Sequence, residues 1–197
     1  MAQADVSVMH WKEGVNSFNA GNYQRAISEF QGAAPTKGVL FNLGVTTSKA
    51  NDPQTAIGHF DSVLRLDSSL GVAYLTRGVC KHTLEQYAAA VKDYDRALET
   101  MGDESVVDYA GEGLPFTLTR VDLLFNKALS LKRMGRVHEA ADCVKQAKEA
   151  VDSNTKSRVA SLDRLMQQLQ SAGAAKSVAA RPPPPAKGKD GKPAGGG

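Results

Sequence analysis

Long apolar runs are missing from this chain of 197 residues. No stretch approaches the roughly 18 consecutive apolar residues that a membrane-spanning helix needs, so direct insertion into a membrane is not expected. Residues 1–10 also lack the basic start and apolar stretch of a secretory signal peptide. Cysteine is scarce, and Cys80 and Cys143 both fall in predicted helices, where buried reduced thiols are expected. These features favour a cytoplasmic protein.

Residues that carry enzymatic or metal chemistry are also sparse. No two histidines have the spacing of metal ligands, and no nucleophile stands beside an evident base. The stretch Gly111-Glu112-Gly113 lacks a third glycine and a βαβ pattern, so it does not predict a nucleotide-binding loop. We therefore expect no enzyme, and neither a cofactor nor a metal site. The histidines are His10, His59, His82 and His138.

The net positive charge comes from one end of the chain. Residues 176–197 hold five basic residues and one acidic residue, a net of +4, so the remainder carries −1 of the total +3. The pI of 8.8 therefore belongs to this tail, and a nucleic-acid-binding face is not expected.

What the chain does have is an internal repeat. A glycine is followed twelve residues later by alanine three times, and a fourth copy has alanine at both positions. The pairs are Gly14 with Ala26, Gly44 with Ala56, Gly78 with Ala90, and Ala128 with Ala140. Small residues at this spacing let the two helices of a hairpin approach closely, and a period near 34 residues is typical of tetratricopeptide repeats (TPRs). The sequence predicts an all-α TPR superhelix.

Four helix-turn-helix repeats are predicted, with a capping helix over the end of the stack. The repeats span about 7–36, 37–69, 70–101 and 121–151, and the cap spans about 155–171. Apolar residues at helical spacing, among them Trp11, are expected to form the core. The predicted TPR domain is residues 1–172.

One insertion breaks the period. Gly14 to Gly44 is 30 residues and Gly44 to Gly78 is 34, but Gly78 to Ala128 is 50. The insertion, about 102–120, has two short extended runs around glycines and is predicted to be a β-hairpin or an ordered loop. Tyr109 within it is expected to be a structural anchor. Insertions in repeat arrays project from one face, which is often the binding face.

The tail, residues 173–197, is rich in alanine, lysine, proline and glycine and is predicted to be disordered. The run Pro182–Lys187 fits a proline-rich ligand of an SH3 domain, and it also fits a plain solvated spacer.

The insertion and its surroundings resemble the amino-terminal domain of the NADPH oxidase activator family. The residues that carry the resemblance are Val107-Asp108-Tyr109, Gly113-Leu114, Phe116, Phe41 to Gly44, Leu70 to Gly78 and Leu124 to Ala128. The resemblance covers roughly residues 8–170. It implies a receptor for a GTP-loaded Rac-type small GTPase, which recruits that GTPase to a membrane NADPH oxidase that makes superoxide. It also implies that residues about 172–186 fold back along the concave groove.

The resemblance implies partner contacts on the insertion and on the loops between repeats. The family's contact positions are occupied here by Lys37, Asp67, Ser69, Glu104, Val106 and Asp108. Asp67 and Asp108 match acidic contacts of the family, and both also fit plain turn residues. Gly102 stands where the family places an arginine, so that guanidinium is missing. Lys37, in a neighbouring loop, is one source of replacement charge.

A generic TPR adaptor that binds a peptide in its concave groove is the alternative. Chaperone-binding TPRs grip a terminal carboxylate with a clamp of Lys, Asn, Asn, Lys and Arg. The corresponding positions here are Trp11, Val15, Asn42, Val72 and Thr76, of which one matches. A buried carboxylate needs paired donors, so a chaperone clamp is disfavoured.

Overall fold

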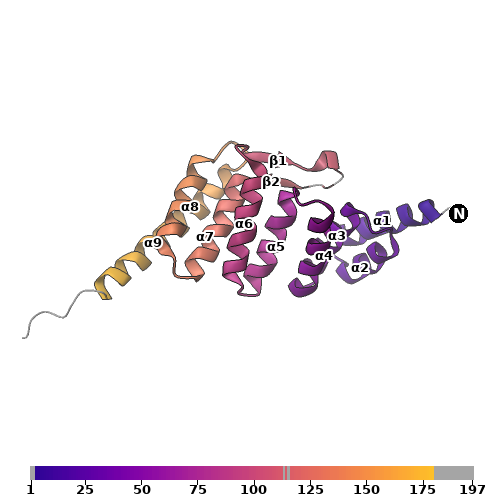
Figure 1. The fold of residues 1–197 in the computed structure, drawn as a ribbon, viewed down its shortest axis with the longest axis horizontal. Coiled ribbons are helices and arrows are strands. Elements are labelled where there is room, and N and C mark those ends of the chain that lie inside the picture. The colour runs from indigo at the N-terminus through magenta and orange to yellow at the C-terminus, as the bar shows by residue number, and fades with distance from the viewer. Residues whose placement is uncertain (1–2, 113, 115, 180–197) are drawn as a thin grey trace, which may run out of the picture.

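The computed structural model describes residues 3–112, 114 and 116–179, with side chains for 5–111, 114 and 116–173. In this part of the chain the helices stand in a row from α1 to α9, and a two-stranded sheet lies along one edge (Figure 1). The elements are α1 (Gln3–Asn19), α2 (Tyr23–Gly32), α3 (Lys37–Lys49), α4 (Pro53–Leu66), α5 (Gly71–Thr83), α6 (Tyr87–Met101), β1 (Val106–Asp108), η1 (Ala110–Glu112), β2 (Thr117–Thr119), α7 (Arg120–Arg133), α8 (Val137–Glu149), η2 (Lys156–Arg158) and α9 (Val159–Ala179). The predicted all-α repeat fold with a hairpin-like insertion is confirmed.

Each helical hairpin turns in the same way. The second residue after the first helix has a positive φ, and the next backbone N–H bonds back to the carbonyl five residues earlier. This pattern satisfies carbonyls at a helix end that would otherwise lack partners. The positive-φ residues are Gly21, Asn51, Glu85 and Gly135, and their N–H neighbours are Asn22, Asp52, Gln86 and Arg136. The spacings of 30, 34 and 50 residues match those of the repeat, so the turn is part of the repeated unit.

Close approach of the paired helices rests on a glycine against an aromatic ring. A Cβ on Gly44 would lie 2.6 Å from Cε1 of Phe60, sixteen residues further along. Gly14 meets Phe30 and Gly78 meets Tyr94 in the same way. The alanines of the sequence pattern are fully buried beside these rings. In the first three hairpins the glycine therefore leaves room for the ring that fills the space between the helices.

A buried ionic network joins α4, α5 and α6. The carboxylate of Asp93, 3% exposed, accepts hydrogen bonds from Arg77 Nη2 at 2.6 Å and forms an ion pair with Lys81 Nζ at 2.8 Å. Arg77 also donates to Asp61 Oδ1 at 2.5 Å. Because a buried charge is costly unless it is paired, these groups fix the register of the three helices against one another.

Trp11 does not lie in the core, so that prediction was wrong. Its side chain is 37% exposed and lines the concave groove beside Val15 and Phe18. The helical spacing was correct, but this stripe of α1 faces the groove, where the indole is left partly exposed.

The last helix caps the stack through Leu162, Leu165 and Leu169, which are at most 3% exposed and pack with α8. It ends at Ala179, so residues 173–179, which were expected in the tail, are helical. The predicted SH3 ligand Pro182–Lys187 lies outside the described residues. In the part of the chain that the structure covers, no helix is long and apolar enough to cross a membrane.

The glycine–ring contact predicts a contrast between two glycines of one repeat. Gly44→Ala is expected to lower the free energy of unfolding by about 1–3 kcal/mol, because Phe60 must move. Gly58→Ala in α4, where a Cβ meets nothing within 4 Å, is expected to raise it by about 0.5–1 kcal/mol. Urea unfolding measures both. Equal effects of the two substitutions would show that the close approach is not needed.

Candidate interaction edge

In its described residues, 102–112, 114 and 116–120, the insertion is a hairpin between α6 and α7. β1 pairs antiparallel with β2, so that Val106 faces Thr119, Val107 faces Leu118 and Asp108 faces Thr117. Tyr109 N donates to the carbonyl of Phe116 at 3.0 Å and extends the ladder by one bond. The two short strands therefore have a fixed register, although a hairpin of this length is marginal alone.

Burial against repeats two and three holds this hairpin in place. Leu114 and Leu118 are fully buried, and the ring of Tyr109 is 5% exposed. A Cβ on Gly71, the first residue of α5, would lie 2.9 Å from both Leu118 Cδ2 and the hydroxyl of Tyr109. Phe116 packs edge-on against Phe41 of α3 with ring centroids 5.0 Å apart. Tyr109 is thus a buried anchor, as predicted, and the insertion shares a hydrophobic core with α3 to α6.

Three of the predicted contact residues form one cluster at the loops beside the hairpin. Lys37 Nζ donates to Asp67 Oδ2 at 2.8 Å. The other oxygen of Asp67 accepts from the Ser69 hydroxyl at 2.6 Å and from Ser69 N at 3.0 Å. The hydrogen bond from Lys37, followed by that from Ser69, lowers the pKa of Asp67 from 3.8 to about 2. The positive charge of Lys37 is therefore already matched within the chain.

The other three predicted contacts, Glu104, Val106 and Asp108, lie on the hairpin itself. The side chains of Glu104 and Asp108 are exposed, and Asp108 Oδ1 accepts from Ala110 N at 3.0 Å. Val106 is half-buried and lines a polar cleft of 580 Å³ between the hairpin and the start of α9. Asp67 and Asp108 both bond the backbone two residues ahead, so both have the turn role that the sequence left open.

The structure brings all six residues to one edge of the stack. The hairpin packs on the first residues of α3 and α5, and these follow the two loops that carry Lys37, Asp67 and Ser69. We call this edge, made of the insertion 102–120 and the α2–α3 and α4–α5 loops, the ledge. The turns within the hairpins lie on the opposite edge (Figure 1).

Arg120 belongs to the ledge, although no sequence pattern pointed to it. It is the first residue of α7, and its guanidinium donates to the backbone carbonyls of Gly102 and Glu104 at the base of the hairpin. A basic residue directly after a predicted strand is too common to signal such a role.

A second surface, the concave groove, lies beside the ledge. It is an apolar hollow of 340 Å³ lined by helices α1 to α3 and by two residues of the insertion, Ala110 and Phe116. The polar groups at its wall are Asn19, Asn42 and Thr46. The insertion therefore contributes to the groove as well as to the ledge.

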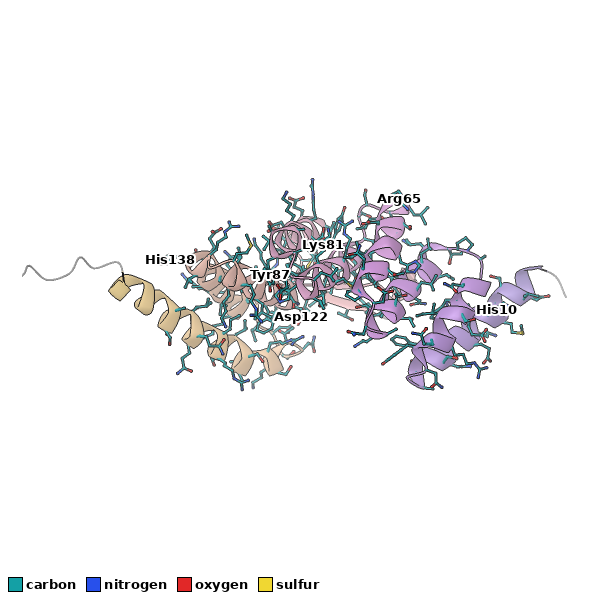
Figure 2. All side chains as sticks on the ribbon, turned by 90° about the horizontal axis from the view of Figure 1, so that it is seen from below. His10, Arg65, Lys81, Tyr87, Asp122 and His138 are labelled. Carbon is teal, nitrogen blue, oxygen red and sulfur yellow. The ribbon has the colours of Figure 1, made fainter. Side chains whose placement is uncertain are left out.

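Histidines do not gather into a site. His10 lies toward the amino-terminal end and His138 toward the other end of the stack (Figure 2). His10 Nδ1 is 2.9 Å from Glu29 Oε2, and His82 Nδ1 is 2.7 Å from the hydroxyl of Ser130. Among the residues that the structure describes, no group of three His, Cys, Asp or Glu side chains could hold a metal ion.

Comparison with known proteins defines the class first. Residues 72–100 match the tetratricopeptide repeat family, and a crystal structure of MamA protein superposes with a TM-score of 0.69 at 16% identity, covering 89% of this chain and 86% of that one. At this identity the superposition supports the fold alone. The chain thus has an all-α, TPR-like helical repeat fold.

Sequence relatives narrow the comparison beyond the repeat fold. The chain is 26% identical over 147 residues to the NADPH oxidase activator of Dictyostelium discoideum, which covers 73% of this chain and 24% of that protein. It is 29% identical over 164 residues to neutrophil cytosol factor 2 of Mus musculus, covering 81% and 30%. The TPR domain of this chain is therefore homologous to part of these proteins. The chain spans about a quarter to a third of their length.

The Lys37–Asp67 pair predicts a pH-dependent contribution to stability. Because the pKa of Asp67 is lower in the folded chain than its ordinary value of 3.8, the pair stabilises the fold above about pH 4 and loses this effect as the pH falls towards 2. Asp67→Asn is expected to lower the free energy of unfolding by less than about 1 kcal/mol at pH 6, and by less still at pH 2.5. Asp103→Asn, at an exposed carboxylate, is the control. A wild-type-to-variant difference that does not change with pH would refute this role of the pair.

Proposed function

We propose that this chain is a non-catalytic adaptor that binds a GTP-loaded Rac-type small GTPase at the ledge. In doing so it helps to activate a superoxide-generating NADPH oxidase. The observation that carries the proposal is that the six residues implied by the family resemblance lie on one edge, around a hairpin with a buried base. Homology to an NADPH oxidase activator also supports this proposal.

The ledge has the physical character of a docking surface. Its exposed groups are mainly polar and acidic, including Glu104 and Asp108, while Val106 adds an apolar contact. Since the hairpin is already packed on α3 and α5, little conformational entropy remains to be lost when a partner docks. The charges at such a surface determine specificity and the rate of association more than the final affinity.

The contact role of Lys37 takes a specific form in this proposal. Its ammonium is paired with Asp67, so the partner meets an ion pair held by Ser69 rather than a single cation. Lys37 is therefore a poor replacement for the arginine that the family has at the position of Gly102. Since Oδ1 of Asp67 already accepts two hydrogen bonds from Ser69, the partner's recognition of Asp67 is expected to use Oδ2, which accepts the bond from Lys37.

The wider assembly is also part of the proposal. The adaptor works in the cytoplasm, and its partners recruit it to the membrane that holds the oxidase. The segment Pro182–Lys187 is a candidate ligand for an SH3 domain of that assembly.

Two substitutions of Asp108 distinguish a role in partner binding from a role in stabilising the turn. Asp108→Asn keeps an oxygen that can accept from Ala110 N but removes the charge, whereas Asp108→Ala removes both. We expect wild type to bind a Rac-type GTPase loaded with a GTP analogue at least tenfold more tightly than the GDP form. Both variants should weaken this binding several-fold, because the charge itself is recognised. Isothermal titration calorimetry measures each affinity.

Asp142→Ala, on the exposed side of α8, is the matched control and should bind as wild type does. Equal affinity for the two nucleotide states would rule out the effector role. If Asp108→Asn bound the GTPase as tightly as wild type while Asp108→Ala bound it more weakly, the role of Asp108 would be limited to stabilising the turn.

The groove favours a second candidate function, a generic adaptor that binds a peptide. Its walls are mainly apolar, and the exposed indole of Trp11 lies within it. An apolar side chain, rather than a terminal carboxylate, matches these walls. Because Ala110 and Phe116 line the groove, deletion of the insertion would damage both surfaces and cannot separate the two functions.

Trp11 offers a direct readout of the groove, because it is the one tryptophan of the chain. Synthetic peptides with a leucine or phenylalanine anchor are expected to shift its fluorescence to the blue, since they exclude water from the indole. Peptides with serine at the anchor are the control. Trp11→Phe, with binding followed by calorimetry, should bind these peptides more weakly and leave GTPase binding unchanged. No shift at millimolar peptide would dismiss this candidate.

A further inference from the structure

Arg120 is attached to the base of the hairpin by both its backbone and its side chain. Arg120 N donates to the carbonyl of Ser105 at 2.9 Å. Nε and Nη2 of its guanidinium donate to the carbonyl of Glu104 at 3.2 and 3.1 Å, and Nη2 also donates to the carbonyl of Gly102. All the acceptors belong to the turn in which α6 ends and β1 begins, so Arg120 joins the two ends of the insertion.

The fork shape of the guanidinium explains how one side chain can do this. Its N–H groups lie in one plane at fixed angles, so two of them reach neighbouring carbonyls together. The turn needs such donors, because Gly102 has a φ of +55° and its carbonyl lies beyond the last turn of α6. A lysine has a single nitrogen and cannot hold two carbonyls with the same geometry.

The charge of this guanidinium is not matched by a carboxylate in the described part of the chain. Several other arginines of the fold do have acidic partners, among them Arg77 with Asp93, Arg136 with Glu139 and Arg158 with Asp122. For Arg120, the acceptors among the described residues are backbone carbonyls, and its Nη1 makes no hydrogen bond to them. The side chain is half-buried, so Nη1 can be reached from outside.

We infer that Arg120 is the cationic anchor of the ledge, and that its Nη1 donates to a carboxylate of the small GTPase. This inference rests on the proposed function. The guanidinium stands at the mouth of the insertion, beside the position where Gly102 offers no side chain. Since its Nε and Nη2 are already held, the contact costs little further side-chain entropy. A charge-assisted bond from a fixed donor is stronger than one between neutral groups.

The neighbouring groups suit such an anchor. Asp103, Glu104 and Asp108 are exposed and acidic, so the ledge combines negative charge with the fixed guanidinium of Arg120, while its other cation, Lys37, is paired with Asp67. A partner surface that places an acidic residue within a basic patch would match this pattern. The same arrangement disfavours a uniformly acidic or uniformly basic surface, which supplies the specificity of the contact.

Two variants test the anchor against a purely structural role. Arg120→Gln removes the charge, and Arg120→Lys keeps it without the fork. Arg136→Gln, at the opposite edge of the stack, is the matched control. Affinity for a Rac-type GTPase loaded with a GTP analogue is measured at several salt concentrations, and hydrogen–deuterium exchange follows the amides of β1 and β2 in each variant.

We expect Arg120→Gln to bind about tenfold more weakly and with a flatter salt dependence, because one interfacial charge is lost. Arg120→Lys should bind at an intermediate level with the wild-type salt dependence. Arg136→Gln should match wild type. The amides of β1 are expected to stay protected in Arg120→Lys, since the strand pairing and the buried core of the hairpin remain.

Three results would overturn the inference, and they are distinguishable. If Arg120→Gln bound the GTPase with wild-type affinity, the anchor role of Arg120 would be refuted and the proposed function would stand. Equal losses in both variants, with unchanged salt dependence and faster exchange of β1, would show that Arg120 only holds the hairpin. If the wild-type chain bound neither the GTP-analogue form nor the GDP form of the GTPase, both the proposed function and the anchor role would be refuted.

Discussion

The ledge depends on the burial of three side chains of the insertion, Tyr109, Leu114 and Leu118, against the first turns of α3 and α5. Two strands of three residues have too few hydrogen bonds to be stable alone. Apolar burial supplies what the ladder lacks, since each fully buried side chain contributes about 1.5–3 kcal/mol. The position of the candidate contacts is therefore set by the core rather than by the strands.

That burial is possible because the repeats themselves are tightly packed. Glycine against an aromatic ring brings together the helices of the first three hairpins, and the network around Asp93 fixes α4, α5 and α6 relative to one another. The glycine that begins α5, Gly71, serves the same purpose between the stack and the insertion. Each repeat of a solenoid contacts only its neighbouring repeats, so a shift in the position of α5 would displace the hairpin directly.

Much of the fold could be predicted because it repeats. The spacing of Gly14, Gly44 and Gly78 determined the hairpins, and the longer interval to Ala128 located the insertion. The exposure of Trp11 could not be predicted, because helical periodicity identifies an apolar stripe but not whether another element covers it. The site was predicted through homology, and Arg120 was missed because its role depends on carbonyls that carry no sequence signal.

The central claim is that the insertion is a rigid part of the core and not a loop at its surface. Hydrogen–deuterium exchange of the wild-type chain at the amides of Tyr109 and Leu114 tests it most directly, because both donate within the insertion, to the carbonyls of Phe116 and Tyr109. The account predicts protection close to that of α5 and α6. Exchange at the rate of an unstructured peptide, while the helices stay protected, would contradict it.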